Sequence, residues 1–398
     1  RSSVRAVLLV LATTAPAPAA ELVNRVDPQG HPLTDVTLDR PPLAAPAPAE
    51  RGPGNDIDPG APPEGDYLAW PVYTNDGQRI LLANRGTDNV TVFDAATRTV
   101  LKTIPVSGTP VDVAASADNV HAVTANLFED TVSIVDLVAG TELATVAVGD
   151  QPSAVRITPG GATAVVGNAV DQSLSVVDIP SATELKQIAG TGFTSTTTIS
   201  FEPGVTTFRV NGFECPSDTL AVHPDFLADE IDFFDLAAGT VTSVPCAADP
   251  RGIDMTPAGN LAVVSHTGGA RTISVVDPAT KTITKTIATP NDLNEPIAVR
   301  PDGSKAAVAI QNATLVVDLG TGAVSSSLNT ASVNRMLSTP DNSYVLAVGY
   351  RGALISYATQ TVVKELNNQV NAYVGAMSPV GQRAVLVATV PEDRRQRH

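Results

Sequence analysis

Two histidines occupy similar positions in neighbouring repeats of the sequence, and their side chains are well suited to chemistry. His223 and His266 are two of only five histidines in the chain. Imidazoles titrate near neutral pH, so this pair could act as acid and base or bind a divalent metal. Without a His-x-x-x-His spacing, a surface or packing role is the alternative. Further ligands or a second base could come from nearby carboxylates: Asp225, Asp229, Glu230, Asp249, Asp292 and Glu295.

A second set of polar residues recurs with the repeat. Asn84, Asn126 and Asn168 each lie ten residues before a repeated aspartate. If the loops that follow them emerge on one face, these side chains would form a ring that could bind a ligand. The alternative is that Asn ends a strand, because it tolerates turn geometry and bonds its own backbone. Later repeats place other polar residues nearby: His223 with Asp225, His266 with Thr267, Gln311 with Asn312, and Tyr350 with Arg351.

Both cysteines of the chain, Cys215 and Cys246, lie in one divergent repeat. No Cys-x-x-Cys pair is present, so a metal or haem attachment site is not indicated. In a chain expected to be exported, the two predict a disulfide, with free buried thiols as the alternative.

Carboxylates are frequent but not clustered by motif. The repeated aspartates precede turn-like phrases and are predicted to form turns, namely Asp94, Asp136, Asp178, Asp235, Asp277 and Asp318. Acidic loops could bind calcium, which prefers several oxygen ligands, or another divalent ion. The carboxylates of such loops are Asp88, Glu129, Asp130, Asp150 and Asp171. No EF-hand phrase is present, and we predict no obligatory cofactor.

The elements that position these residues follow an internal repeat. Successive repeated aspartates are 42, 42, 57, 42 and 41 residues apart. Each unit contains four short phrases rich in β-branched residues and bounded by Gly, Asp, Asn or Pro, as in residues 110–116, 121–125, 131–136 and 142–148. Four antiparallel strands in about 40 residues form one propeller blade. We therefore predict an all-β fold, a β-propeller with eight four-stranded blades, or seven if the divergent unit breaks the count.

Three phrases carry a resemblance to a known family. They are LANRGTDNVTVFD at 82–94, PVDVA at 110–114 and PSAVRITPGG at 152–161. They resemble the YVTN-type β-propeller repeat proteins, over roughly residues 67–390. The resemblance implies a secreted, periplasmic or cell-surface propeller with lactonase-like propellers as neighbours. It implies no catalytic residues, because the motif specifies a blade rather than a reaction.

The ends of the chain differ from the repeats. Residues 1–20 combine a basic start, an apolar run and small residues, which predicts a signal peptide. Residues 21–65 read as an arm and Pro-rich linker, in which 33–38 is expected to close the ring as a strand. The propeller is expected over 66–390, followed by a basic tail at 391–398. No segment is long and apolar enough to predict a membrane span.

Charge and motif content limit the functional classes. The formal charge of −16 argues against nucleic acid as the main partner. Our first hypothesis is a secreted, non-catalytic scaffold that presents its loop face to a protein, a glycan or a small ligand. The alternative is a lactonase-like or lyase-type enzyme that uses His223, His266 and a divalent metal in the central mouth. A purely structural cell-surface repeat is the third hypothesis.

Overall fold

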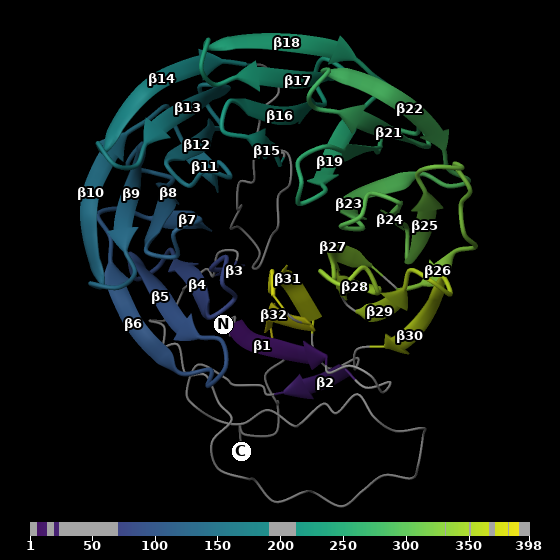
Figure 1. The fold of residues 1–398 in the computed structure, drawn as a ribbon, viewed down its shortest axis with the longest axis horizontal. Coiled ribbons are helices and arrows are strands. Elements are labelled where there is room, and N and C mark those ends of the chain that lie inside the picture. The colour runs from purple at the N-terminus through teal and green to yellow at the C-terminus, as the bar shows by residue number, and fades with distance from the viewer. Residues whose placement is uncertain are drawn as a thin grey trace, which may run out of the picture.

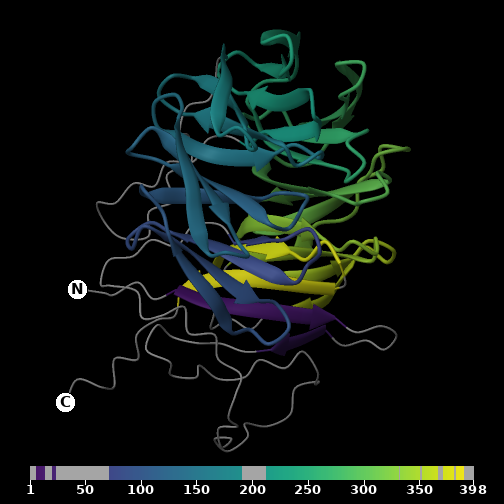
Figure 2. The same ribbon diagram turned by 60° about the vertical axis from the view of Figure 1, so that its left-hand side comes forward.

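The computed structural model describes residues 71–190, 212–330, 332–349, 352–365, 371–380 and 382–389, together with two N-terminal strands at 6–13 and 20–23. The strands in these residues form eight four-stranded sheets, all antiparallel. Figure 1 shows the sheets arranged as blades around a ring, with the first strand of a blade near the centre and the fourth at the perimeter. Figure 2, turned by 60°, shows the blades stacked side by side. The all-β propeller prediction is confirmed, and the count favours eight blades over seven.

The first four blades use the strands in chain order. Blade 1 contains β3 (Val72–Tyr73), β4 (Arg79–Asn84), β5 (Asn89–Asp94) and β6 (Val100–Pro105), and blade 2 contains β7 (Pro110–Ala115), β8 (His121–Asn126), β9 (Thr131–Asp136) and β10 (Thr141–Ala147). Blade 3 contains β11 (Pro152–Ile157), β12 (Thr163–Asn168), β13 (Ser173–Asp178) and β14 (Thr183–Ala189), and blade 4 contains β15 (Glu214–Ser217), β16 (Leu220–Asp225), β17 (Glu230–Asp235) and β18 (Thr240–Pro245).

The next three blades follow the same plan, whereas the last joins the two ends of the chain. Blade 5 contains β19 (Pro250–Met255), β20 (Ala262–His266), β21 (Thr272–Asp277) and β22 (Thr282–Ala288), and blade 6 contains β23 (Leu293–Val299), β24 (Lys305–Ile310), β25 (Ala313–Asp318) and β26 (Leu328–Asn329). Blade 7 contains β27 (Val333–Ser338), β28 (Tyr344–Gly349), β29 (Ala353–Ser356) and β30 (Thr361–Glu365), and blade 8 contains β31 (Asn371–Met377), β32 (Gln382–Thr389), β1 (Ala6–Thr13) and β2 (Ala20–Val23).

The apolar core lies between blades rather than within them. Side chains of successive strand residues point to opposite faces of a sheet, so the second strand serves both neighbours. In blade 2, Ala122 packs into a cluster shared with blade 1, while Val123 and Ala125 pack into a cluster shared with blade 3. Because both faces of a blade are covered, its middle strands are buried at nearly every position, as in β8 and β9.

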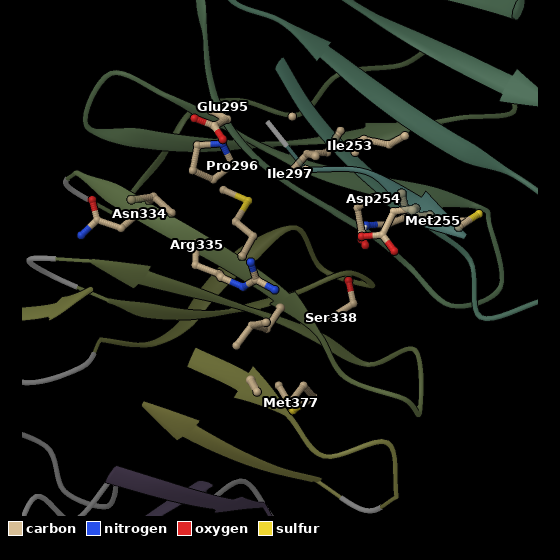
Figure 3. A pocket seen from close by; sticks show the side chains of 18 of the residues that line it. Ile253, Asp254, Met255, Glu295, Pro296, Ile297, Asn334, Arg335, Ser338 and Met377 are labelled. Carbon is tan, nitrogen blue, oxygen red and sulfur yellow. Dashed lines mark hydrogen bonds between the residues drawn. The ribbon is translucent and has the colours of Figure 1, made fainter. Parts of the chain in front are cut away.

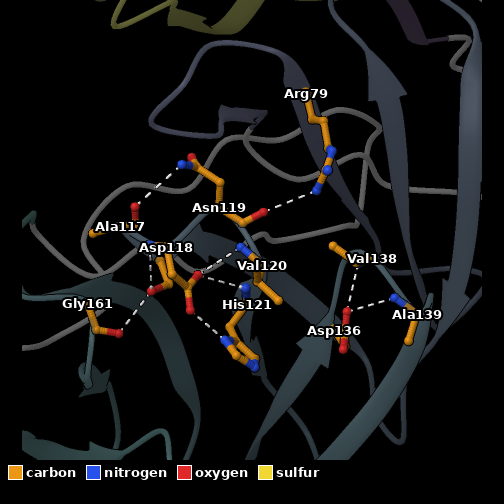
Figure 4. Close-up of polar contacts among 11 residues, drawn as sticks. Arg79, Ala117, Asp118, Asn119, Val120, His121, Asp136, Val138, Ala139 and Gly161 are labelled. Carbon is orange, nitrogen blue, oxygen red and sulfur yellow. Dashed lines mark hydrogen bonds and ion pairs between the residues drawn. The ribbon is translucent and has the colours of Figure 1, made fainter.

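The repeated aspartates end the third strand of a blade and hold the turn that follows. Asp136 accepts hydrogen bonds of 2.7 Å from the backbone amides of Val138 and Ala139 (Figure 4). These amides hold the pKa of the Asp136 carboxyl below its usual range. Asp94 and Asp235 bond the same two amides of their own turns. The prediction that these residues are turn formers is confirmed.

Polar contacts also join neighbouring blades at the turns. Arg79 of blade 1 donates to the backbone oxygen of Asn119 in blade 2 at 3.1 Å, as Figure 4 shows. At the perimeter, Lys102, Lys186 and Lys285 occupy equivalent positions in the fourth strands of blades 1, 3 and 5. Each donates to a turn carbonyl of the next blade. The blades are therefore joined at both their inner turns and their outer edges.

The predicted disulfide between Cys215 and Cys246 is wrong for this structure, in which both cysteines are free. Cys215 lies on β15, the first strand of blade 4, and Cys246 directly follows β18, the fourth strand of the same sheet. Three strand spacings of about 4.8 Å put roughly 14 Å between these strands, whereas a disulfide needs Cα atoms within about 7 Å. Burial raises the pKa of both thiols, that of Cys246 to about 12.

Ring closure uses a segment other than the expected one. β1 pairs antiparallel with β32 from Ala6↔Thr389 to Thr13↔Gln382, and β2 extends this sheet. The expected closing strand 33–38 lies outside the described residues, as do the rest of the Pro-rich linker and the tail 391–398. The apolar run that predicted a signal peptide is thus the strand that covers the edge of β32.

We expect removal of residues 1–23 to lower the melting temperature, because it deletes the two outer strands of blade 8. Deletion through residue 38 should have no further effect. The measurement is thermal unfolding of the full chain and both truncated chains. A melting temperature that is unchanged by the first deletion and falls with the second would contradict closure by β1 and assign the role to 33–38.

Candidate functional site

The candidate site is a cavity along the ring axis, lined by the first strands of blade 1 and of blades 3 to 8, with a volume of about 580 Å³. Apolar side chains, including Met255, Ile297 and Met336, form part of its wall. The remaining wall is strongly charged. A concave site with a few convergent polar groups on an apolar wall is typical of small-ligand binding.

Three adjacent blades contribute a charged side chain from the same register position. Arg156 on β11 pairs with Val165, Glu214 on β15 pairs with Val222, and Asp254 on β19 pairs with Val263. In blade 2 this position is Ala114, which is buried in the core between blades. Since the first strands converge at the axis, equivalent positions on neighbouring blades place these charges around one cavity.

Arg335 contributes a further positive charge, from β27 in blade 7. Figure 3 shows its side chain and the Asp254 carboxylate on strands at either side of the cavity. The guanidinium lowers the pKa of both Glu214 and Asp254, although burial outweighs this effect. Arg335 therefore balances part of the negative charge on blades 4 and 5.

Asp112 of blade 2 anchors Arg156. Their side chains approach to 3.3 Å, and the same carboxylate oxygen of Asp112 accepts a hydrogen bond of 3.0 Å from the backbone amide of Val155. Arg156 also lies 3.9 Å from Glu214. Burial raises the pKa of Asp112, and Arg156 opposes that change. The cation is thus shared between two carboxylates.

Asp254 is a carboxyl in the cavity whose pKa is raised into the neutral range. Burial, together with a smaller contribution from the neighbouring Glu214, raises its pKa to about 7. The backbone amide of Val299, in blade 6, donates to Asp254 Oδ2 at 2.6 Å and opposes this shift. Burial also raises the pKa of Glu214, whereas Arg156 lowers it. Two carboxyl groups in one cavity cannot both ionise freely, so Asp254 titrates near neutral pH.

A close backbone approach fixes the wall between blades 5 and 6. A Cβ at Gly252 would lie 1.8 Å from the carbonyl oxygen of Glu295, so only glycine fits there. That same oxygen accepts a hydrogen bond of 3.1 Å from Ser265. Beside it, Arg251 pairs with Asp249 at 2.9 Å and stacks over the Phe226 ring at 4.4 Å.

The structure does not place the two predicted histidines in this cavity. His223 on β16 and His266 on β20 are both fully buried within their blades. His266 bonds the backbone oxygen of Ala247 at 2.7 Å and the hydroxyl of Ser274 at 2.8 Å. Burial lowers the pKa of His266, so this side chain is neutral at physiological pH. Within the described residues, no three His, Cys, Asp or Glu side chains gather as a metal site would require.

The predicted asparagine ring is placed inside the blades. The three asparagines Asn84, Asn126 and Asn168 are buried. Each donates a hydrogen bond of 2.8–2.9 Å to a hydroxyl on the third strand of its own blade. His266 holds the same position in blade 5. Asp225 takes it in blade 4, where it accepts from the amide of Leu227 at 2.9 Å. These residues tie strands together rather than meeting at one surface. Tyr350 and Arg351 lie outside the described residues.

Of the charged cavity residues, the sequence analysis named only Glu295, as a carboxylate near the two histidines, although a signal for others existed. Arg156, Glu214 and Asp254 are charged residues within short first-strand phrases that are otherwise mainly apolar. A charge at that position is costly unless it faces a polar cavity or a partner. Comparing the same phrase across repeats would have pointed to these three residues.

The charge of Asp254 gives the stability of the protein a pH dependence. Its pKa of about 7 in the folded protein exceeds the value near 4 of an unfolded chain. Between these two values the folded protein keeps a proton that the unfolded chain releases. The contribution of Asp254 to the free energy of unfolding is therefore fully present below pH 4 and is lost as the pH rises to 7. In Asp254→Asn the free energy of unfolding should not fall in this way. Relative to the native chain, it should increase by about 1–2 kcal/mol between pH 5 and 8.

The measurement is urea unfolding at pH 5, 6.5 and 8. Glu184→Gln, which removes an exposed carboxylate from the outer strand β14, is the matched control and should follow the native chain. Parallel stability curves for Asp254→Asn and the native protein would contradict the raised pKa.

Comparisons with known proteins support the fold. No protein-family model matches the chain, so membership of the YVTN repeat family is not confirmed. No curated protein sequence matches it either. A solved structure of Kuenenia stuttgartiensis hydrazine synthase is similar with a TM-score of 0.51 and 19% identity, over 72% of this chain and 95% of that one. A solved structure of the dihydro-heme d1 dehydrogenase NirN, in complex with DHE, is similar with a TM-score of 0.59 and 16% identity, over 79% of this chain and 69% of that one. These similarities show that the chain shares a β-propeller fold with both proteins.

Proposed function

We propose that the protein is a binding protein whose axial cavity holds a small polar ligand. The observation that carries this proposal is the convergence of Arg156, Glu214, Asp254 and Arg335, from four different blades, on one cavity of about 580 Å³. Burying charge is expensive, and the fold does not need a charge at the position of Arg156, Glu214 and Asp254, because blade 2 has the buried Ala114 there. A polar ligand would offset that cost.

This proposal keeps the scaffold hypothesis but moves its site from the loop face to the ring axis. The residues expected to form the loop ring, Asn84, Asn126 and Asn168, are occupied with hydrogen bonds inside their blades. The cavity charges instead line a space of about 580 Å³. A small ligand is therefore favoured over a protein or a glycan.

An enzyme remains the second candidate on one observation. Asp254 has a pKa of about 7, which suits a group that gives and takes a proton near neutral pH. In this case the acid–base residue is Asp254 rather than the pair His223 and His266. Binding of Ca²⁺ or another divalent ion is examined in the same experiments, with the metal added as a ligand.

Export of the chain is proposed from its first residues, whose basic start, apolar run and small residues suit a signal peptide. Within the described residues, no helix has the length and hydropathy needed to cross a membrane. The apolar run also forms β1, so cleavage after it would open the edge of β32.

The test of export is N-terminal sequencing of the protein recovered outside the cytoplasm of an expressing bacterium. We expect the protein in that fraction, and its first residue shows whether the exported form keeps β1. Recovery of the protein only from the cytoplasm would contradict export, and an exported chain that keeps residues 6–13 would contradict a cleaved leader.

The test of the binding function is thermal unfolding in the presence of small amines, carboxylates, sugars, nucleosides and divalent metal ions. We expect one class, at about 100 times its Kd, to raise the melting temperature by roughly 5 °C. The variant Asn294→Trp places a large side chain in the lining of the cavity and should reduce the shift. Glu184→Gln should retain it. Equal shifts in Asn294→Trp and the native protein, or none with any class, would contradict the proposal.

A further inference from the structure

We propose that the cavity recognises a small organic cation, an alkylammonium whose charged group lies between Glu214 and Asp254. This inference rests on the proposed binding function and names the chemical class of the ligand. It is drawn from the charges that meet in the cavity and from the apolar wall beside them.

The first step is the charge balance of the cluster. Asp112 and Arg156 form an ion pair at 3.3 Å, and Asp112 is further held by the amide of Val155. Arg335 then faces both Glu214 and Asp254 and lowers the pKa of each. Of the other charged lining residues, Arg251 is paired with Asp249 at 2.9 Å, and Glu295 adds a further carboxylate. The carboxylates of the cluster therefore outnumber the two guanidinium groups that they share, and positive charge between Glu214 and Asp254 would reduce this excess.

The second step is how the cluster meets this excess when no ligand is bound. The raised pKa of Asp254 means that a proton supplies the missing charge at and below neutral pH. An ammonium group can take the place of that proton, because it is also a single positive charge and donates hydrogen bonds to carboxylate oxygens. Binding of the cation would then release the proton from Asp254.

The other groups packed around Asp254 do not supply this charge. Tyr357, on the blade 7 side, donates to the backbone oxygen of Ala298 and accepts a hydrogen bond of 2.7 Å from the hydroxyl of Ser338. Burial raises the pKa of Tyr357 well above its usual value, so it stays neutral. Beyond it, Arg300 is paired with Asp302 at 2.9 Å. Glu214 and Arg335 are therefore the charged groups that determine the state of Asp254.

The third step separates an organic cation from a metal ion. Calcium takes six to eight oxygen ligands, and zinc takes nitrogen or sulfur ligands that the described part of the cavity does not gather. Met255, Met336 and Met377 line the same cavity and offer adaptable apolar contacts. A short alkyl chain attached to the ammonium group would pack against them.

The experiment is titration calorimetry of the full chain with n-butylammonium at pH 6 and pH 8. Butanol, butyrate, Ca²⁺ and Zn²⁺ serve as neutral, anionic and metallic probes. We expect butylammonium to bind about tenfold more tightly at pH 8, because Asp254 is then ionised in most molecules. In unbuffered solution near pH 7, binding should also release protons.

Asp254→Asn should weaken this binding and remove its pH dependence, while Glu184→Gln should change neither. Glu214→Gln provides a second variant, which should also weaken binding. Tighter binding of butylammonium at pH 6, or equal binding by Asp254→Asn and the native protein, would overturn the inference.

The outcomes separate this inference from the function on which it rests. If butanol, butyrate or a metal ion binds, Asn294→Trp blocks it and butylammonium does not bind, the cavity is a ligand site but not for an organic cation. If butylammonium and every other probe fail to bind, both the inference and the proposed function are contradicted.

Discussion

The structure depends on the fact that no blade can bury its own faces. Each apolar cluster is shared by two neighbouring blades, as the division of Ala122 and Val123 between two clusters shows. A blade at an open end would leave one of these faces in water, at a cost of about 1.5–3 kcal/mol for each large apolar side chain. The ring must therefore close. It does so because β1, near the start of the chain, pairs with β32, near its end.

Closure also creates the candidate site. The first strands of the blades converge on the axis, so a side chain that would be an ordinary core residue in one blade faces the corresponding residues of its neighbours. Ala114 keeps that position apolar in blade 2, whereas Arg156, Glu214 and Asp254 make it charged in the next three blades. Three of the charges on the cavity wall thus come from one repeated position, and Arg335 comes from the position that Asp112 holds in blade 2, with the blade architecture unchanged.

Local features could be predicted from the sequence, and long-range ones could not. The four strands of a blade and the turn held by Asp136 follow from phrases of a few residues. The pairing of β1 with β32 has no local signal, and the apolar composition of β1 fits a signal peptide equally well. Cys215 and Cys246 suggested a disulfide because they share one repeat, but their strands lie at opposite edges of its sheet. Asp254 and Glu214 are 40 residues apart in sequence and meet only when the ring forms.

The hydrogen bond from the Val299 amide to Asp254 joins blade 5 to blade 6 at the axis. One carboxyl group therefore serves the seam between two blades as well as the cavity. A change in its charge alters the strength of that bond, since a carboxylate accepts a hydrogen bond more strongly than a neutral acid. The exchange of the Val299 amide with solvent deuterium is consequently a built-in reporter, through which events in the cavity can be read from the backbone of the neighbouring blade.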